Sequence, residues 1–212
     1  MYKAVIFDLD GTLTNTLADI AAAMNRALRL HGLPEWPEDA YRYLVGNGAK
    51  VLSERCVRDR QELAPAVRQT YQAYYETHNL VQTKPYDGVP EMLAALAAQG
   101  FKLAVLSNKP DADTKAVIRH FFPDVPFAAV RGQVEGVPVK PDPAGALAVA
   151  DALGVPPPEC LYLGDTDVDM RTAAAAGMYP IGALWGFRTA EELQSSGARR
   201  IARTPANVLE CV

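Results

Sequence analysis

Short apolar runs bounded by polar or turn-forming residues recur along the chain. They cover residues 3–9, 102–107, 126–130, 160–163, 179–184 and roughly 199–202. Continuous apolar runs of this length are typical of strands buried on both faces, as in parallel sheets. We therefore expect a β-strand at each of them.

Helical patterns lie between several of these runs, and each has a recognisable start or end. Expected helices cover residues 89–99, 144–153, 170–176 and the stretch before Gly197. The helix at 144–153 follows Asp142 and Pro143, which suit an N-cap and a first turn, and it stops at Gly154. This alternation of strand and helix predicts an α/β fold with a doubly wound, Rossmann-like parallel sheet.

One long gap interrupts the alternation. About ninety residues separate the first strand from the second, far more than a crossover helix needs. Helical spacing of apolar residues predicts helices near 17–30, 38–44, 49–58 and 64–77. We interpret residues 15–84 as an inserted all-α helical cap domain, and residues 1–14 and 85–212 as the catalytic core domain.

Composition narrows the class of protein. Of the 212 residues, 49% are hydrophobic and 22% charged, an ordinary globular balance. The net charge of -4 disfavours nucleic acid as a partner, and no apolar run is long enough to span a membrane. The three cysteines lack metal-ligand spacing, so we expect a reduced, cytoplasmic protein. Either a monomer or a homodimer is expected.

The clearest chemical signal is the pair of acids that follows the first strand. Asp8 ends the strand, Asp10 lies two residues on, and Gly11 permits a sharp turn. Burying a carboxylate is costly unless a cation compensates its charge, so this pair predicts a bound cation. The simpler alternative is that both acids only cap a strand–loop junction.

A second acidic group follows the strand at 160–163. It contains Asp165, Asp167 and Asp169, and a helix follows. Capping of that helix would explain one of these acids, Asp167 above all, but not all three. Carboxylates from two strand ends are the ligands that Mg²⁺ prefers, so we predict a magnesium site here.

Two further fragments offer groups that bind anions. Ser107 and Asn108 end the second strand, and Lys140 precedes the helix at 144–153. A turn residue and a solvated surface lysine are the plain alternatives. In an open α/β sheet, however, ligands bind at the carboxyl ends of the strands, where all four fragments fall.

These residues resemble the four motifs of the haloacid dehalogenase superfamily of phosphohydrolases, in order and spacing. The matching pieces are 8–12, 107–108, 140–141 and Gly164-Asp165 with Asp169. Segments 45–49 and 185–189 make the chain most similar to the phosphoglycolate phosphatases of that superfamily. One position departs from many relatives, which carry an acid where this chain has Asn15, at the expected hinge into the cap.

The resemblance implies a role for each motif. Asp8 is the expected nucleophile and Asp10 the acid and base, with Mg²⁺ held by Asp8, Asp165 and the backbone carbonyl of Asp10. Ser107, Asn108 and Lys140 are expected to hold the phosphate. Behind them, Asp169 is expected to orient a metal-bound water or Lys140, and Thr12 to support the metal ligands.

The substrate implied is a small phosphorylated metabolite, and 2-phosphoglycolate is the first candidate. In the cap, the loop formed by Gly46, Asn47 and Gly48, with Lys50 beside it, is expected to receive a carboxylate. A turn between two cap helices is the plain alternative for these glycines.

Other activities stay open at this point. Within the same superfamily these are a phosphosugar mutase and a phosphatase of another small metabolite or of pyrophosphate. Outside it, a phosphorylatable receiver-type signalling domain also gathers acids, a hydroxyl and a lysine around Mg²⁺. The helical insert and Asp10 argue against the receiver, because a receiver needs no acid to protonate a leaving group.

Overall fold

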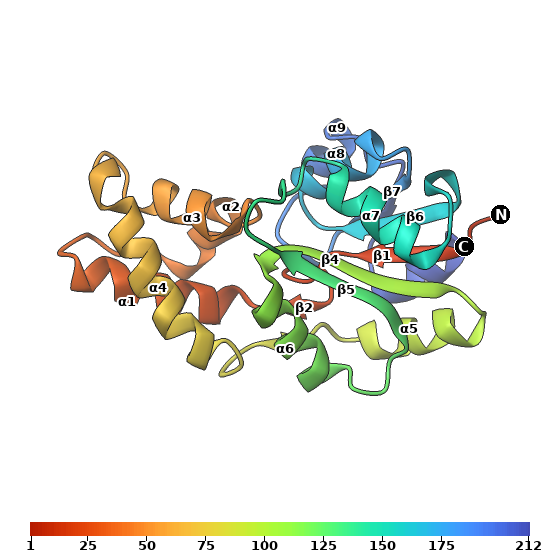
Figure 1. The fold of residues 1–212 in the computed structure, drawn as a ribbon, viewed down its shortest axis with the longest axis horizontal. Coiled ribbons are helices and arrows are strands. Elements are labelled where there is room, and N and C mark those ends of the chain that lie inside the picture. Colours follow the sequence, from red (N-terminus) through yellow and green to blue (C-terminus); the bar gives the residue numbers. More distant parts are fainter.

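The computed structural model describes residues 1–212, which form a parallel sheet with helices on both faces and a separate group of helices at one end (Figure 1). The sheet order is β5-β4-β1-β6-β7-β8. Its strands are β1 (Ala4–Phe7), β4 (Lys102–Pro110), β5 (Phe127–Gln133), β6 (Cys160–Gly164), β7 (Tyr179–Ala183) and β8 (Arg200–Ala202), all parallel. Each expected strand is confirmed, and so is the doubly wound sheet.

Alternation along β1 shows how the sheet is buried on both faces. Val5 and Phe7 face α5 (Val89–Ala98) and α6 (Asp111–Phe121) in one apolar cluster. Ala4 and Ile6 face α7 (Ala144–Leu153) and α8 (Asp167–Ala175) in another. All four side chains of β1 are fully buried, which a continuous apolar run predicts. A last core helix, α9 (Ala190–Ser195), lies beside α8.

Taken in chain order, the six strands of the sheet are arranged 3-2-1-4-5-6, the Rossmann order. The connections leave β1 and β6 in opposite directions, so the carboxyl ends of these two strands flank the topological switch point, where ligands bind. Receiver domains have a different strand order, with five strands, so the sheet argues against the receiver alternative.

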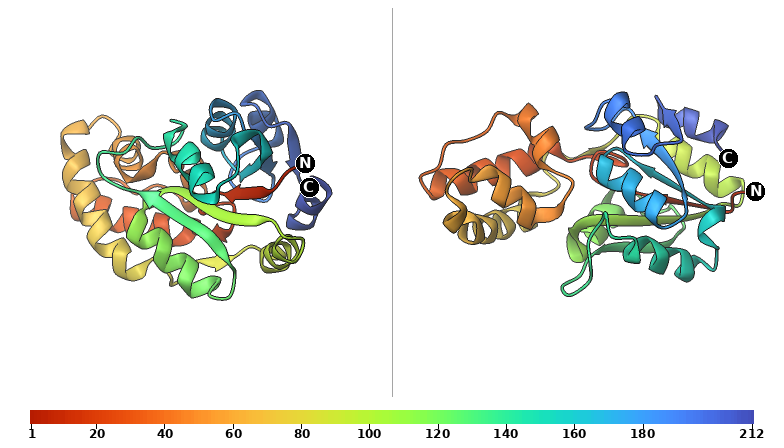
Figure 2. Two further views of the ribbon diagram at one scale, coloured as in Figure 1. Left: turned by 45° about the vertical axis from the view of Figure 1, so that its right-hand side comes forward. Right: turned by 90° about the horizontal axis from the view of Figure 1, so that it is seen from above.

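Helices α1 (Leu17–Leu30), α2 (Tyr41–Leu44), α3 (Gly48–Cys56) and α4 (Ala64–His78) form the separate group, here called the helical insert. They pack around an apolar cluster of their own. Ile20, Met24 and Leu28 bury one face of α1, at the four-residue spacing of a helical stripe. Figure 2 shows the insert standing to one side of the sheet in both views.

Two short antiparallel strands, β2 (Thr14–Asn15) and β3 (Lys84–Pro85), connect the insert to the core. This short ribbon was not predicted from the sequence. Asn15 accepts a hydrogen bond from the backbone N–H of Leu17, so it helps to start α1. Asp19 ties the two connections together, because its buried carboxylate accepts hydrogen bonds from the backbone of residues 82 and 83.

Two helices differ from expectation. Helix α6 was not predicted, because it starts directly after β4 at a polar stretch and buries only Thr114, Val117 and Ile118. Helix α8 starts at Asp167, three residues earlier than expected, since Asp169 completes a capping box with Thr166. None of the helices has the length and apolar character that a membrane crossing requires.

Candidate active site

Three buried carboxylates meet where β1 and β6 end. Asp8, Asp165 and Asp169 each offer an oxygen, and these oxygens all lie within 4.8 Å of one another. Gly11 makes this approach possible, because a Cβ on Gly11 would collide with the carboxylate of Asp165. The backbone of Gly11 also has a φ of 89°, which favours glycine.

Lys140 lies against this cluster as its buried counter-charge. Its Nζ is 2.9 Å from Oδ1 of Asp8 and 2.7 Å from Oδ1 of Asp169, and the lysine is only 3% exposed. Three carboxylates facing one ammonium leave an excess of negative charge in a buried place. Such an excess is costly unless a further cation is bound.

The electrostatics of Asp8 show this excess. Burial and the neighbouring Asp169 raise the pKa of Asp8 to about 7, against the opposing effect of Lys140. Burial, Asp169 and Asp8 likewise raise the pKa of Asp165 well above its ordinary value. A divalent cation would favour the ionised form of both groups.

The donor set fits a hard divalent ion. The side-chain contacts of Asp8 fall on Oδ1, which accepts from the backbone N–H of Leu9 at 2.7 Å and pairs with Lys140, while Oδ2 accepts none. Asp165 accepts from the Thr12 hydroxyl at 2.8 Å and from the Phe187 backbone N–H at 2.9 Å. Both acids keep oxygen lone pairs free for a metal.

Asp169 is held differently. One oxygen pairs with Lys140, and the other accepts from the backbone N–H and the hydroxyl of Thr166. Each oxygen of Asp169 thus has two partners within the protein, counting the Tyr162 hydroxyl, whereas each oxygen of Asp165 has one, which suits a residue that orients Lys140 rather than one that binds the metal.

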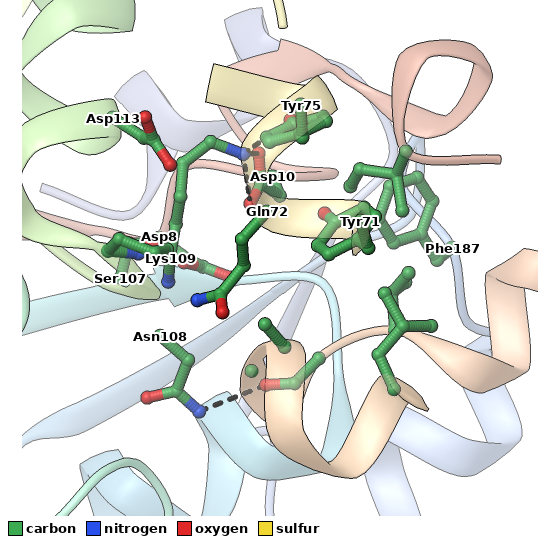
Figure 3. A pocket seen from close by; sticks show the side chains of 17 residues that line it. Asp8, Asp10, Tyr71, Gln72, Tyr75, Ser107, Asn108, Lys109, Asp113 and Phe187 are labelled. Atoms are coloured by element: carbon green, nitrogen blue, oxygen red, sulfur yellow. Dashed lines mark hydrogen bonds and ion pairs between the residues drawn. The ribbon is translucent and has the colours of Figure 1, made fainter. Parts of the chain in front are cut away.

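Ser107 and Asn108 lie at the end of β4, beside Asp8, and both line a cleft between the core and the helical insert (Figure 3). Asn108 joins three parts of the site. Its side-chain amide donates to the backbone oxygens of Gly46 and Lys140, and its oxygen accepts from the Lys140 backbone N–H. The structure therefore brings the second and third motifs together, with the insert closed over them.

The insert residues named from the sequence do not all reach the cleft. Gly46 and Gly48 line it, and a Cβ on Gly48 would lie 3.2 Å from the backbone oxygen of Asn108. Asn47 instead accepts a hydrogen bond from Arg55, and the exposed Lys50 lines a different surface depression. Lys50 is thus not brought to the candidate site, because it lies on the outer side of α3.

Lys109 was not among the residues predicted from the sequence, yet the structure places its side chain in the site. Its Nζ lies 2.9 and 3.0 Å from the two oxygens of Asp10 and 2.7 Å from the Tyr75 hydroxyl (Figure 3). Although burial lowers it, the pKa of Lys109 is raised overall by Asp10. The available signal was a lysine that follows a serine and an amide at the end of an apolar run.

The rest of the cleft is mostly neutral. Its neutral side chains come mainly from the insert, together with Pro110 of β4 and with Phe187 of the loop after β7, which packs against the insert. Tyr71 and Tyr75 stack with ring centroids 5.2 Å apart, one helical turn apart on α4. Their placement depends on tertiary packing, so sequence spacing alone did not reveal it.

Residues 2–177 match the family model of the haloacid dehalogenase-like hydrolases, and this chain belongs to that family. It is 35% identical over 187 residues to the phosphoglycolate phosphatase of Aquifex aeolicus, covering 87% of this chain and 86% of the relative. It is also 35% identical over 207 residues to that of Rhodospirillum rubrum, covering 93% and 86%. The chain is a phosphoric monoester hydrolase similar to phosphoglycolate phosphatases.

Solved structures agree with this assignment. A crystal structure of a candidate phosphoglycolate phosphatase from Lactobacillus delbrueckii subsp. bulgaricus matches with a TM-score of 0.95 and 30% identity, covering 99% of this chain and 98% of the other. A haloacid dehalogenase-like hydrolase from Streptococcus pneumoniae matches with a TM-score of 0.91 at 20% identity, covering 99% and 98%, which shows the fold alone. The family match and the strand order set the receiver alternative aside.

Proposed function

We propose that the chain is a Mg²⁺-dependent phosphatase that hydrolyses 2-phosphoglycolate to glycolate and phosphate through an aspartyl-phosphate on Asp8. The observation that carries the proposal is the buried group of Asp8, Asp165 and Lys140 at the switch point of the sheet. The relatives named phosphoglycolate phosphatase support the choice of substrate. A cytoplasmic location is part of the same proposal, since free cysteines suit a reducing compartment.

Asp8, Asp165 and the backbone carbonyl of Asp10 would hold Mg²⁺, with Thr12 and Phe187 fixing the carboxylate of Asp165. When bound, the ion supplies positive charge that offsets the repulsion between a carboxylate nucleophile and a phosphate dianion. The three acids and one lysine described above carry an excess of negative charge, which that positive charge would offset.

In the first step, an oxygen of Asp8 attacks phosphorus, and the bond to the alkoxide leaving group breaks. Asp10 donates a proton to the leaving oxygen, so glycolate departs with its hydroxyl protonated. Ser107, the Asn108 backbone and Lys140 hold the phosphoryl oxygens, where negative charge must be stabilised.

In the second step, Asp10 takes a proton from water, whose oxygen attacks phosphorus and releases phosphate from Asp8. Lys140 pairs with Asp8 and Asp169, so it stays in position through both steps. Closure of the insert over Asn108 keeps bulk water from the nucleophile while the first step proceeds.

The test is phosphate release from 2-phosphoglycolate in Mg²⁺, in excess chelator and after Ca²⁺ replacement. Activity should require Mg²⁺ and be inhibited by Ca²⁺, which takes more ligands in looser geometry. Ethyl phosphate, similar in size but without the carboxylate, should be cleaved with a kcat/KM lower by about tenfold or more, as a charge-assisted contact of roughly 1.5–3 kcal/mol implies. Full activity in chelator, or no release of phosphate, would overturn the proposal.

A further inference from the structure

The cleft beyond the phosphate site has few charged side chains, and most of them are acidic. Four of its lining side chains are acids or bases, namely Asp8, Asp10, Asp113 and Lys109. Lys109 is the one cation among them, and the other three are acids. An anionic group entering this cleft would meet repulsion from every charged neighbour except Lys109.

The other cations near the site are engaged elsewhere. Lys140 pairs with Asp8 and Asp169 below the cleft. Arg42 donates to the backbone oxygen of Gly186, and Arg188 donates to that of Val45, where the core meets the insert. None of these three side chains lines the cleft.

Lys109 is placed so that a second anion can share it. Its ammonium has three N–H donors, and they face the two oxygens of Asp10 and the hydroxyl of Tyr75. Contact with one oxygen of Asp10 instead of two would free a donor for a new partner. Figure 3 shows Lys109 reaching into the cleft between Asp10 and Tyr75, with Asp113 on its far side.

We propose that Lys109 is the specificity-determining residue, which binds the carboxylate of the substrate while keeping contact with Asp10. The proposal rests on the proposed function. Lys109, instead of the insert loop and its Lys50, supplies the positive charge that binds the carboxylate. Asp10 must lie next to the leaving oxygen, so a cation bonded to Asp10 lies close to the group that this oxygen carries. A short substrate such as 2-phosphoglycolate, with one carbon between the ester oxygen and the carboxylate, suits that distance.

Tyr75 has a matching role as a positioning residue. It accepts a hydrogen bond from Lys109 and lies under its ammonium, which is 4.7 Å from the ring centroid. Because Tyr75 belongs to α4 of the insert, the lysine is held by both parts of the protein. Packing of the insert against the core therefore holds Lys109 in position to bind the substrate carboxylate.

The first experiment measures kcat/KM for 2-phosphoglycolate and ethyl phosphate in wild type, in Lys109→Met and in Lys115→Met. Lys115 is a half-exposed lysine of α6 that pairs with Asp111 on the surface, so its variant is a matched control and should behave as wild type. In Lys109→Met, the preference for phosphoglycolate over ethyl phosphate should fall by tenfold or more. An equal loss on both substrates would overturn the proposal, because it would mean that Lys109 only positions Asp10.

Binding without turnover gives the second readout and stays informative if the variant is inactive. Phosphonoacetate and ethylphosphonate differ in the same carboxylate and cannot be hydrolysed at an ester bond. Calorimetry in Mg²⁺ should show that wild type prefers phosphonoacetate and that Lys109→Met loses this preference while its circular dichroism is unchanged. Retention of the preference in Lys109→Met would refute the role of Lys109 and leave the proposed function intact. If wild type does not hydrolyse 2-phosphoglycolate, the proposed function itself is refuted.

Discussion

Stability of the metal-free protein should fall as the pH rises from 5 to 7, and Asp8→Asn should make that fall clearly smaller. The pKa of Asp8 is raised to about 7 by burial and by Asp169, whereas an unfolded chain gives Asp a pKa of about 3.9. Between these values the folded state binds more protons than the unfolded state. The free energy of unfolding therefore decreases with increasing pH in this window.

The size of this loss of stability follows from the shift in the pKa of Asp8. About three pKa units at ~1.4 kcal/mol each correspond to roughly 4 kcal/mol over the full window, and to about 2 kcal/mol between pH 5 and pH 7. That is a large part of a typical domain stability of about 5–15 kcal/mol. In urea, it should move the unfolding midpoint by about 1 M.

The assay is urea unfolding, followed by circular dichroism in excess chelator, at pH 5 and pH 7. Wild type should lose stability between the two values, and Asp8→Asn should lose clearly less, because it has no proton to release at that position. Saturating Mg²⁺ should restore wild type at pH 7 by about 2.7 kcal/mol when the ion is at a hundred times its dissociation constant. The reasoning is refuted if both proteins show the same pH dependence in chelator.

Three further substitutions have effects on activity that the geometry of the site predicts. Asp10→Asn should lower kcat/KM, which reports the first step, much more for an alkyl phosphate than for an aryl phosphate, whose leaving group needs little protonation; equal losses in kcat/KM would argue against the acid role. Asp165→Ala should raise the Mg²⁺ concentration needed for half-maximal activity more than Asp169→Ala, since each oxygen of Asp169 already has two partners within the protein and each oxygen of Asp165 only one; a titration showing the reverse order would mean that the two roles are exchanged. Gly48→Val should lower kcat/KM for 2-phosphoglycolate and for an aryl phosphate alike, because its Cβ would press on the backbone of Asn108, which holds the phosphoryl group of both, at a φ of 80°; unchanged kcat/KM values would mean that Gly48 does not keep Asn108 in place.

Much of the fold could be predicted from the sequence because its signals are local. Apolar runs located the strands, and residues 17–30 and 144–153 were expected as helices with the bounds that the structure shows. The acids after β1 and β6 indicated the site because parallel strands bring their carboxyl ends to one edge of the sheet.

The remaining features depend on contacts between distant segments. Helix α6 has only three buried side chains, so its apolar stripe is weak in the sequence. The pairing of Lys109 with Asp10 and Tyr75 joins residues 99 and 34 positions apart, which no local pattern specifies. Lys50 was expected near the substrate because it lies only two residues after Gly48, but the turn of α3 directs it outward.

The central claim is that phosphate passes through a covalent bond to Asp8, and the most direct measurement is acid-quench trapping of the phosphoenzyme. Asp10→Asn should accumulate it from a ³²P-labelled aryl phosphate, because that leaving group departs unaided while the water that follows lacks its base. Peptide mapping should place the label on Asp8, with none on Asp8→Asn. Label on another residue, or steady turnover of Asp8→Asn at a rate near that of wild type, would contradict the account.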